Sequence, residues 1–313
     1  MLSAVFSQLG IMLLMVGTGY LLQRRGVVSD RFQSDLSALI LWVALPCSIV
    51  ESGLLDMEQG LSPLLVTTGL SALCYFFTIF LAEGSSRILH ISPPHSGMFC
   101  CMIVFANTAF IGFPLCSLLL GNKGVFYCSL FNMVFTFFFF TYGVRKLGSR
   151  QKGGVAKAFM DDPGLIATFV MLLLFLLQWK PPAFLRTFLS GMSALCTPLS
   201  MLVIGGMLTK VDLRGVFKQK YYYAITLMRL LIIPLSALML SLPLAALGLD
   251  KDILFVVIIM CALPAGSLTA IYSQTYGRSA TFVSGGIIHT MLCFCITLPC
   301  ILLLAKWALY GRI

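Results

Sequence analysis

The stretch Phe105-Ala-Asn107-Thr108-Ala-Phe-Ile-Gly112-Phe-Pro114-Leu115 carries a glycine and a proline inside a hydrophobic segment long enough to cross a bilayer. A second stretch, Cys261-Ala-Leu-Pro264-Ala-Gly266-Ser267-Leu-Thr269-Ala270, does the same later in the chain. Proline removes a backbone donor and clashes with the preceding turn, so protein or water must satisfy the freed groups. The two stretches therefore predict two broken membrane helices, at matching positions of the two halves of the chain.

The composition is that of a membrane protein with many spans. The 313 residues are 59% hydrophobic and only 10% charged, and the mean hydropathy is +0.99. A soluble domain could not bury so much apolar surface. We expect an all-α fold with short connections, no soluble domain and no cleavable signal peptide, because Arg24 and Arg25 follow the first apolar run. Ten transmembrane helices are predicted, near 2–22, 32–51, 61–82, 94–119, 124–143, 163–179, 184–208, 221–247, 253–275 and 280–307.

The net charge of +10 indicates membrane topology rather than nucleic-acid binding. Of the 21 lysines and arginines, fourteen follow odd-numbered spans, six lie on the opposite side and Arg229 lies within a span. Cytoplasmic connections carry the excess of basic residues in membrane proteins. The distribution predicts a multi-pass protein of the cell membrane with both termini outside.

The eleven cysteines all fall inside predicted spans, where cysteine behaves as a small apolar residue. None of their spacings resembles a tetrahedral metal site. We therefore expect no metal, no cofactor and no structural disulfide.

An internal repeat is visible in the spacing of four prolines. Ala44-Leu45-Pro46-Cys47-Ser48 matches Cys196-Thr197-Pro198-Leu199-Ser200, and the next matched prolines, Pro114 and Pro264, follow at similar distances. The halves 1–155 and 156–313 each hold five spans, so the second half must enter the membrane in the opposite sense. Inverted repeats with paired broken helices are typical of secondary transporters, whose substrate site lies at the bilayer midplane. A chance coincidence of four prolines is the alternative.

These motifs resemble the auxin efflux carrier family of bacterial permeases and plant auxin carriers over nearly the whole chain. Asn107-Thr108 with Gly112, Pro114 and Leu115 is similar to the signature of the family's fourth span. Ala262-Leu263-Pro264 with Gly266, followed by Tyr276-Gly277, is similar to that of the ninth. The remaining similar motifs are Gly19-Tyr20 through Arg24-Arg25-Gly26, Met228-Arg229 with Pro234, and Thr297-Leu298-Pro299.

The resemblance implies two inverted five-helix repeats, with the fourth and ninth helices crossing near their prolines. It further implies a scaffold from spans 1, 2, 6 and 7 and a mobile part from spans 3–5 and 8–10 that moves like an elevator. Organic anions are the family's substrates, and a homodimer is common. This chain departs from the family at Leu268 and Thr269 and has a short connection over 144–160. Its substrate preference therefore does not follow from the resemblance.

The residues themselves also favour an anion. Second half-helices are expected to start near Pro114 and near Gly266 and Ser267, and helix N-termini carry partial positive charge. No Asp or Glu sits in the middle of a predicted span, and Asp35, Glu51 and Glu83 lie at span ends. We expect a small organic anion, a carboxylate above all, to bind at the breaks. The candidate substrate-binding residues are Asn107, Thr108, Gly112, Pro114, Pro264, Gly266, Ser267, Thr269 and Arg229.

Each of these candidates also has a structural interpretation. Asn107 is the first candidate, because its amide can donate to a carboxylate, but it could instead cap the first half-helix. The hydroxyls of Thr108, Ser267 and Thr269 could bond their own backbone, and the prolines could set shape only. Arg229 either attracts the anion or pairs with free carbonyls of a broken helix. His289 is a possible proton relay or a satisfied interior histidine.

We interpret the chain as a secondary carrier of small organic anions that works by alternating access, without an obligatory coupling ion and with export favoured. A proton- or sodium-coupled uptake carrier is the alternative. An anion channel would need a continuous polar stripe, and an enzyme would need a catalytic constellation that the spans do not offer. The expected partners are the anion, the bilayer and a possible second copy, but no nucleic acid.

Overall fold

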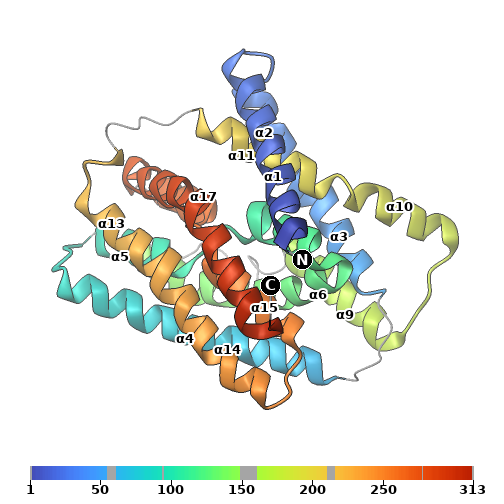
Figure 1. Ribbon diagram of the computed structural model, residues 1–313. Coiled ribbons are helices and arrows are strands. Elements are labelled where there is room, and N and C mark those ends of the chain that lie inside the picture. The colour runs from blue at the N-terminus through green and yellow to red at the C-terminus, as the bar shows by residue number, and fades with distance from the viewer. Residues whose placement is uncertain are drawn as a thin grey trace. The chain divides into compact units, whose positions relative to one another are not determined.

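The computed structural model describes residues 2–54, 61–93, 95–148, 161–209, 216–276 and 278–311, and within these ranges every regular element is a helix (Figure 1). Four of the helices are π-helical segments, labelled η. In chain order the helices are α1 (Leu2–Arg24), α2 (Asp30–Leu39), η1 (Ile40–Ala44), α3 (Leu45–Ser52), α4 (Ser62–Ile88), α5 (His95–Val104), η2 (Thr108–Gly112), α6 (Phe113–Phe138), η3 (Phe139–Gly143), α7 (Val144–Lys146), α9 (Pro163–Leu177), α10 (Ala183–Ser193), α11 (Cys196–Leu208), α13 (Lys220–Leu227), η4 (Met228–Ile232), α14 (Ile233–Ala246), α15 (Lys251–Ala262), α16 (Ser267–Thr275) and α17 (Ala280–Tyr310).

Three of the π-helical segments end two residues before a proline. Pro46, Pro114 and Pro234 are each the second residue of the α-helix that follows η1, η2 and η4. A proline ring clashes with the carbonyl four residues earlier and offers it no N–H. The wider π turn relieves the clash, because donors there bond five residues back, as Ile233 N–H does to Met228 O. These helices therefore continue past their prolines.

Within the described residues, six helical stretches are long and apolar enough to cross a membrane, so this is a multi-pass membrane protein. They are Asp30–Ser52, Ser62–Ile88, Thr108–Lys146, Ala183–Leu208, Lys220–Ala246 and Thr281–Tyr310, and His95–Val104 and Pro163–Leu177 are shorter apolar helices. Inside the longest stretch, Gly121 leaves helical geometry at φ 59° and ψ −146°, which an L side chain rarely adopts. This turn falls between the predicted fourth and fifth spans, 94–119 and 124–143. The count of ten spans and the inverted repeat remain predictions.

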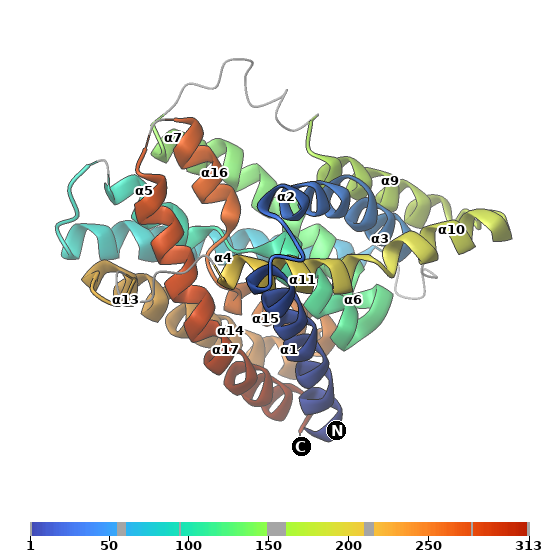
Figure 2. The same cartoon turned by 90° about the horizontal axis from the view of Figure 1, so that it is seen from above.

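The chain divides into two compact units, and the first comprises Met1–Leu65, Ala109–Met133 and Met160–Lys210. Here α1 packs against α11 (Figures 1 and 2). Gly19 lies against the backbone of Leu202, and Gly205 against that of Val16, so a side chain at either glycine would separate the two helices. Gln33 ties α2 to the same pair by donating to Val203 O at 2.8 Å.

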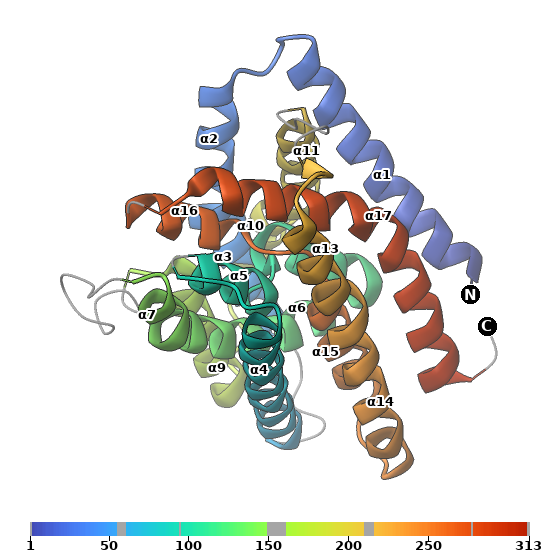
Figure 3. The same cartoon turned by 90° about the vertical axis from the view of Figure 1, so that its left-hand side faces the viewer.

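The second unit comprises Val66–Thr108, Val134–Phe159 and Val211–Ile313. In it α13 packs against α17 and α5, and α14 packs against α15 (Figure 3). An aromatic cluster surrounds the buried ring of Phe105, which contacts the rings of Tyr75, Phe135 and Phe139 at centroid distances of 5.0 to 6.4 Å. Gly143 lies against the same ring. The first broken segment is therefore anchored by apolar packing inside this unit.

Candidate functional site

The two broken segments meet and pair with each other inside the second unit. Helix α5 ends at Val104 and α15 ends at Ala262, and the chain between these ends and the next helices is extended. Asn107 N–H donates to Pro264 O, and Gly266 N–H donates to Phe105 O, both at 2.9 Å. This short antiparallel bridge is centred on Ala106 and Ala265. The breaks therefore satisfy each other's backbone, as hydrocarbon requires. We call residues 105–107 and 263–266 the crossing.

Gly266 makes this close approach possible. A Cβ atom at this position would lie 2.5 Å from Ala106 O, inside any normal contact. Helix α16 begins at Ser267, as expected. In the fourth predicted span, however, helical structure resumes at Thr108, so the prediction that the second half-helix starts near Pro114 is wrong by six residues. The reason is η2, whose π turn takes the chain past Pro114 without a break.

Arg229 fastens both broken helices from η4. Its side chain is buried, and Nε donates to Leu263 O at 2.8 Å, while Nη2 donates to Met260 O at 3.2 Å. Nη1 donates to Ile103 O at 3.1 Å and to Val104 O at 3.4 Å. These carbonyls end α5 and α15, where the helix dipoles are negative. The observed contacts are thus those of the structural interpretation, pairing with the free carbonyls of broken helices.

The structure adds Thr290, which the sequence did not single out. Its Oγ1 accepts a hydrogen bond from Ala265 N–H at 3.2 Å and donates to Ile287 O at 2.8 Å. The position of Thr290 in the middle of a span, next to His289, could have indicated a role for its hydroxyl. The sequence does not show, however, which threonine of α17 faces the crossing.

Two buried hydroxyls on α16 have no hydrogen-bond partner within the described part of the chain. They belong to Thr269 and Ser273, whose side chains are fully buried. Four residues apart, they share one face of α16, which begins within the first turn of the helix. A buried hydroxyl without a partner is unfavourable, so the pair offers two donors to a ligand. Ser273 was not among the predicted site residues.

The second unit brings together most of the predicted site residues, but not all. Asn107 and Thr108 are buried, Pro264 and Gly266 form the crossing, and Ser267 is half-buried. Gly112 and Pro114 are buried as well but belong to the first unit.

His289 lies in the second unit within a group of aromatic rings. It is 1% exposed, and its Nδ1 is 2.6 Å from the hydroxyl of Thr226. The rings of Phe217, Tyr222 and Tyr223 lie at centroid distances of 5.4, 6.1 and 4.7 Å. The other ring nitrogen, Nε2, is buried and has no partner among the described residues. The histidine is therefore only half satisfied.

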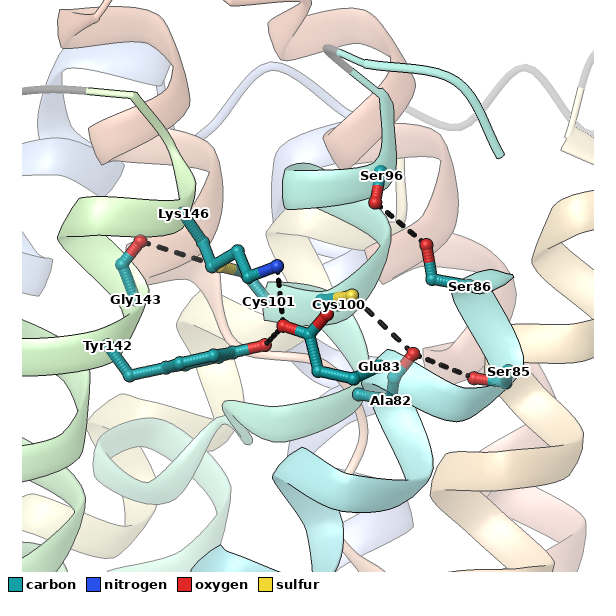
Figure 4. Close-up of polar contacts among 10 residues, drawn as sticks. All are labelled: Ala82, Glu83, Ser85, Ser86, Ser96, Cys100, Cys101, Tyr142, Gly143 and Lys146. Atoms are coloured by element: carbon teal, nitrogen blue, oxygen red, sulfur yellow. Dashed lines mark hydrogen bonds and ion pairs between the residues drawn. The ribbon is translucent and has the colours of Figure 1, made fainter. Parts of the chain in front are cut away.

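A charged cluster at Glu83 was also missed by the sequence (Figure 4). Glu83 was expected at a span end, yet α4 continues through it to Ile88. Its Oε1 accepts from the Tyr142 hydroxyl at 2.7 Å and pairs with Lys146 Nζ at 2.5 Å. These partners come from η3 and α7, and they stabilise a carboxylate whose side chain is 24% exposed. The cluster thereby joins the predicted third and fifth spans.

Comparison with known proteins gives consistent matches. Residues 4–162 and 155–302 match the family described as membrane transport protein. An uncharacterized transporter of Methanocaldococcus jannaschii is 23% identical over 289 residues, which cover 90% of this chain and 92% of the relative. An uncharacterized transporter of Methanothermobacter thermautotrophicus is 24% identical over 291 residues, covering 92% and 94%.

Proposed function

Because the chain belongs to the membrane transport protein family, and so is a transport protein rather than an enzyme, we propose that it is a secondary carrier of small organic anions in the cell membrane. The substrate binds at the crossing, between the helix ends that begin at Thr108 and Ser267. Both termini lie outside, and ten spans form two inverted repeats. The membrane potential, negative inside, favours export.

The observation that best supports an anionic substrate is the pair of hydroxyls on α16 that have no partner among the described residues. Thr269 is a buried donor in the first turn of α16, near the helix N-terminus and its partial positive charge, and Ser273 is a second buried donor one turn further along. No Asp or Glu occurs in 95–115 or 253–275, so nothing acidic competes there. A carboxylate supplies acceptors for both hydroxyls and a negative charge for the helix end. Asn107 donates to the same ligand, whereas Arg229 holds the site together.

The division into two units supports an elevator-like step. The first unit contains the helices of predicted spans 1, 2, 6 and 7, and the second contains those of spans 3, 8, 9 and 10. Predicted spans 4 and 5, which the resemblance placed wholly in the mobile part, are divided, because Ala109–Met133 belongs to the first unit. The crossing, Arg229 and the α16 hydroxyls all belong to the second unit. We propose that this unit carries the substrate as a body, since its polar contacts hold the two breaks in one arrangement.

The proposal is tested by ligand binding followed by counterflow. Purified protein is screened by thermal shift against a panel of carboxylates, because a ligand of the folded state raises the melting temperature. The best ligand is then used for counterflow in proteoliposomes. Thr269→Val with Ser273→Ala should remove both signals, and Thr187→Val, an exposed threonine of α10, should keep them. Failure of every carboxylate, or unchanged counterflow in the double variant, contradicts the proposal.

A second candidate function, proton-coupled transport, is favoured by one observation, the unpartnered Nε2 of His289. A buried imidazole nitrogen without a partner can accept a proton. The two functions differ in their driving force. A membrane potential is worth about 2.3 kcal/mol per charge at 100 mV, or about a fifty-fold gradient.

Proteoliposomes clamped with potassium and valinomycin, at equal pH and without sodium, separate the two. For a uniporter, an inside-positive potential drives anion accumulation. For proton coupling, flux follows a pH gradient instead. His289→Gln then removes the response to the pH gradient, whereas His90→Gln, at a surface histidine, keeps it. That combination of results would show that uniport is wrong.

A further inference from the structure

An apolar groove of about 600 Å³ opens between α4 and α14 in the second unit. Its walls include Phe77, which is 40% exposed, and Met239, which is 68% exposed. Both belong to long apolar helices that cross the membrane. Exposed apolar side chains of membrane-spanning helices face lipid, so the groove is open to hydrocarbon-soluble molecules from the bilayer.

Two cysteine thiols lie together at the inner end of this groove. Cys74 of α4 and Cys261 of α15 both line it, and a hydrogen bond joins their side chains. They are 7% and 3% exposed, and both are free thiols. Cys74 lies in the middle of α4, and Cys261 lies near the end of α15, three residues before Pro264.

A positive charge lies next to one of these sulfurs. The Arg229 guanidinium interacts electrostatically with Cys261 and hydrogen-bonds the carbonyls of Met260 and Leu263 on either side of it. The thiolate is the reactive form of cysteine, and a neighbouring arginine stabilises negative charge on sulfur. This placement of Arg229 favours Cys261 as the nucleophile of the pair, with Cys74 as its partner.

We propose that Cys74 and Cys261 are a redox-active thiol pair that a lipid-soluble two-electron oxidant, such as a quinone, converts to a disulfide through the groove. Two S–H bonds break and one S–S bond forms. The two protons and two electrons pass to the quinone, which becomes a quinol. The disulfide ties α4 to the last turn of α15, next to the crossing.

The chain contains a matched control pair. Cys116 and Cys128 are also joined by a side-chain hydrogen bond, but both are fully buried and neither lines the groove. If proximity alone decided oxidation, the two pairs would react alike. If access through the groove decides it, only Cys74 and Cys261 react.

The test uses the full-length protein in proteoliposomes, treated with a short-chain quinone or with diamide, whose N=N bond accepts the same two hydrogens. Remaining thiols are trapped with N-ethylmaleimide under denaturing conditions, and peptides are mapped by mass spectrometry without reduction. The expected result is a peptide pair linked through Cys74 and Cys261 that dithiothreitol separates, with Cys116 and Cys128 alkylated. No such link, or equal oxidation of both pairs, overturns the proposal.

A second variant tests the route. Ser236 lines the groove, so Ser236→Phe should fill it and slow formation of the linked peptide several-fold. Leu231→Phe, at an exposed position of η4 that does not line the groove, is the control and should leave the rate unchanged. Equal rates in the two variants would show that the oxidant does not use the groove. Each variant is compared by its melting temperature, so that a misfolded protein is recognised.

Discussion

Arg229 keeps a full charge inside a membrane span by placing it among four backbone carbonyls. We expect Arg229→Met to lower the free energy of unfolding by about 3 kcal/mol or more, because carbonyls of both α5 and α15 lose their donors. Thermal unfolding in detergent measures the loss, and Arg186→Met, at an exposed arginine of α10, should have little effect. A variant that is as stable as the parent but no longer binds anion would instead make Arg229 a ligand contact.

Asn107 is buried at the crossing, where its backbone N–H already bonds Pro264 O. Asn107→Ala retains that bond and removes only the side-chain amide. We expect transport to fall at least about tenfold, the equivalent of one lost hydrogen bond to a charged group, with expression and monodispersity near normal. Counterflow in proteoliposomes is the measurement. Asn132→Ala, at a buried asparagine of the first unit, is the control, and a fully active Asn107→Ala would end the role of the amide in binding.

The sequence indicated some of these side chains and not others, for a physical reason. Pro264 and Gly266 interrupt a helix through local effects, so the sequence predicted the position of the second break to within a residue. The partners of Arg229 are backbone carbonyls, which carry no signature in sequence. Thr290 and Ser273 are hydroxyls among many in the spans, and their roles depend on which face of a helix is turned inward. The tertiary fold decides that face.

Among the elements, the pairing of the two broken segments depends most on Gly266. We expect Gly266→Ala to lower the free energy of unfolding by about 1–3 kcal/mol and to impair transport, because the new methyl group meets Ala106 O. Gly69→Ala in α4, where a methyl group meets nothing within 4 Å, should instead raise stability by up to about 1 kcal/mol. Paired melting curves compare them. Equal melting temperatures would mean that the bridge yields without strain.

The predicted fourth span shows what the prolines and glycines of a helix do not predict about its structure. Proline and glycine predicted a break, and a break exists at residues 105–107, yet Pro114 itself is not part of it. A proline predicts that the α-helical hydrogen bonds must change. It does not tell whether the chain leaves the helix or widens one turn, since both satisfy the carbonyls. The choice between the two is made by tertiary packing, which the local sequence does not show.

For the whole molecule, the orientation in the membrane follows from the distribution of basic residues. We expect single cysteines introduced at 56–58 to react with an impermeant maleimide added outside, and cysteines at 150–152 to react only after permeabilisation, because the latter connection is basic. Both positions lie outside the described residues. The unmodified protein, with its eleven cysteines, gives the background. The reverse labelling pattern would place the termini inside and invert the direction assigned to each half-helix.

The π-helical segments before Pro46, Pro114 and Pro234 have a consequence for how this sequence is compared with others. A π turn contains one residue more than the α turn it replaces, so each segment is an insertion absorbed within a continuous helix. A related chain without the proline can lack the extra residue of the π turn and still have a helix that runs in the same direction. Alignment gaps of one residue inside spans are therefore expected at these three places. Numbering that ignores them assigns every later side chain in the span to the wrong helix face.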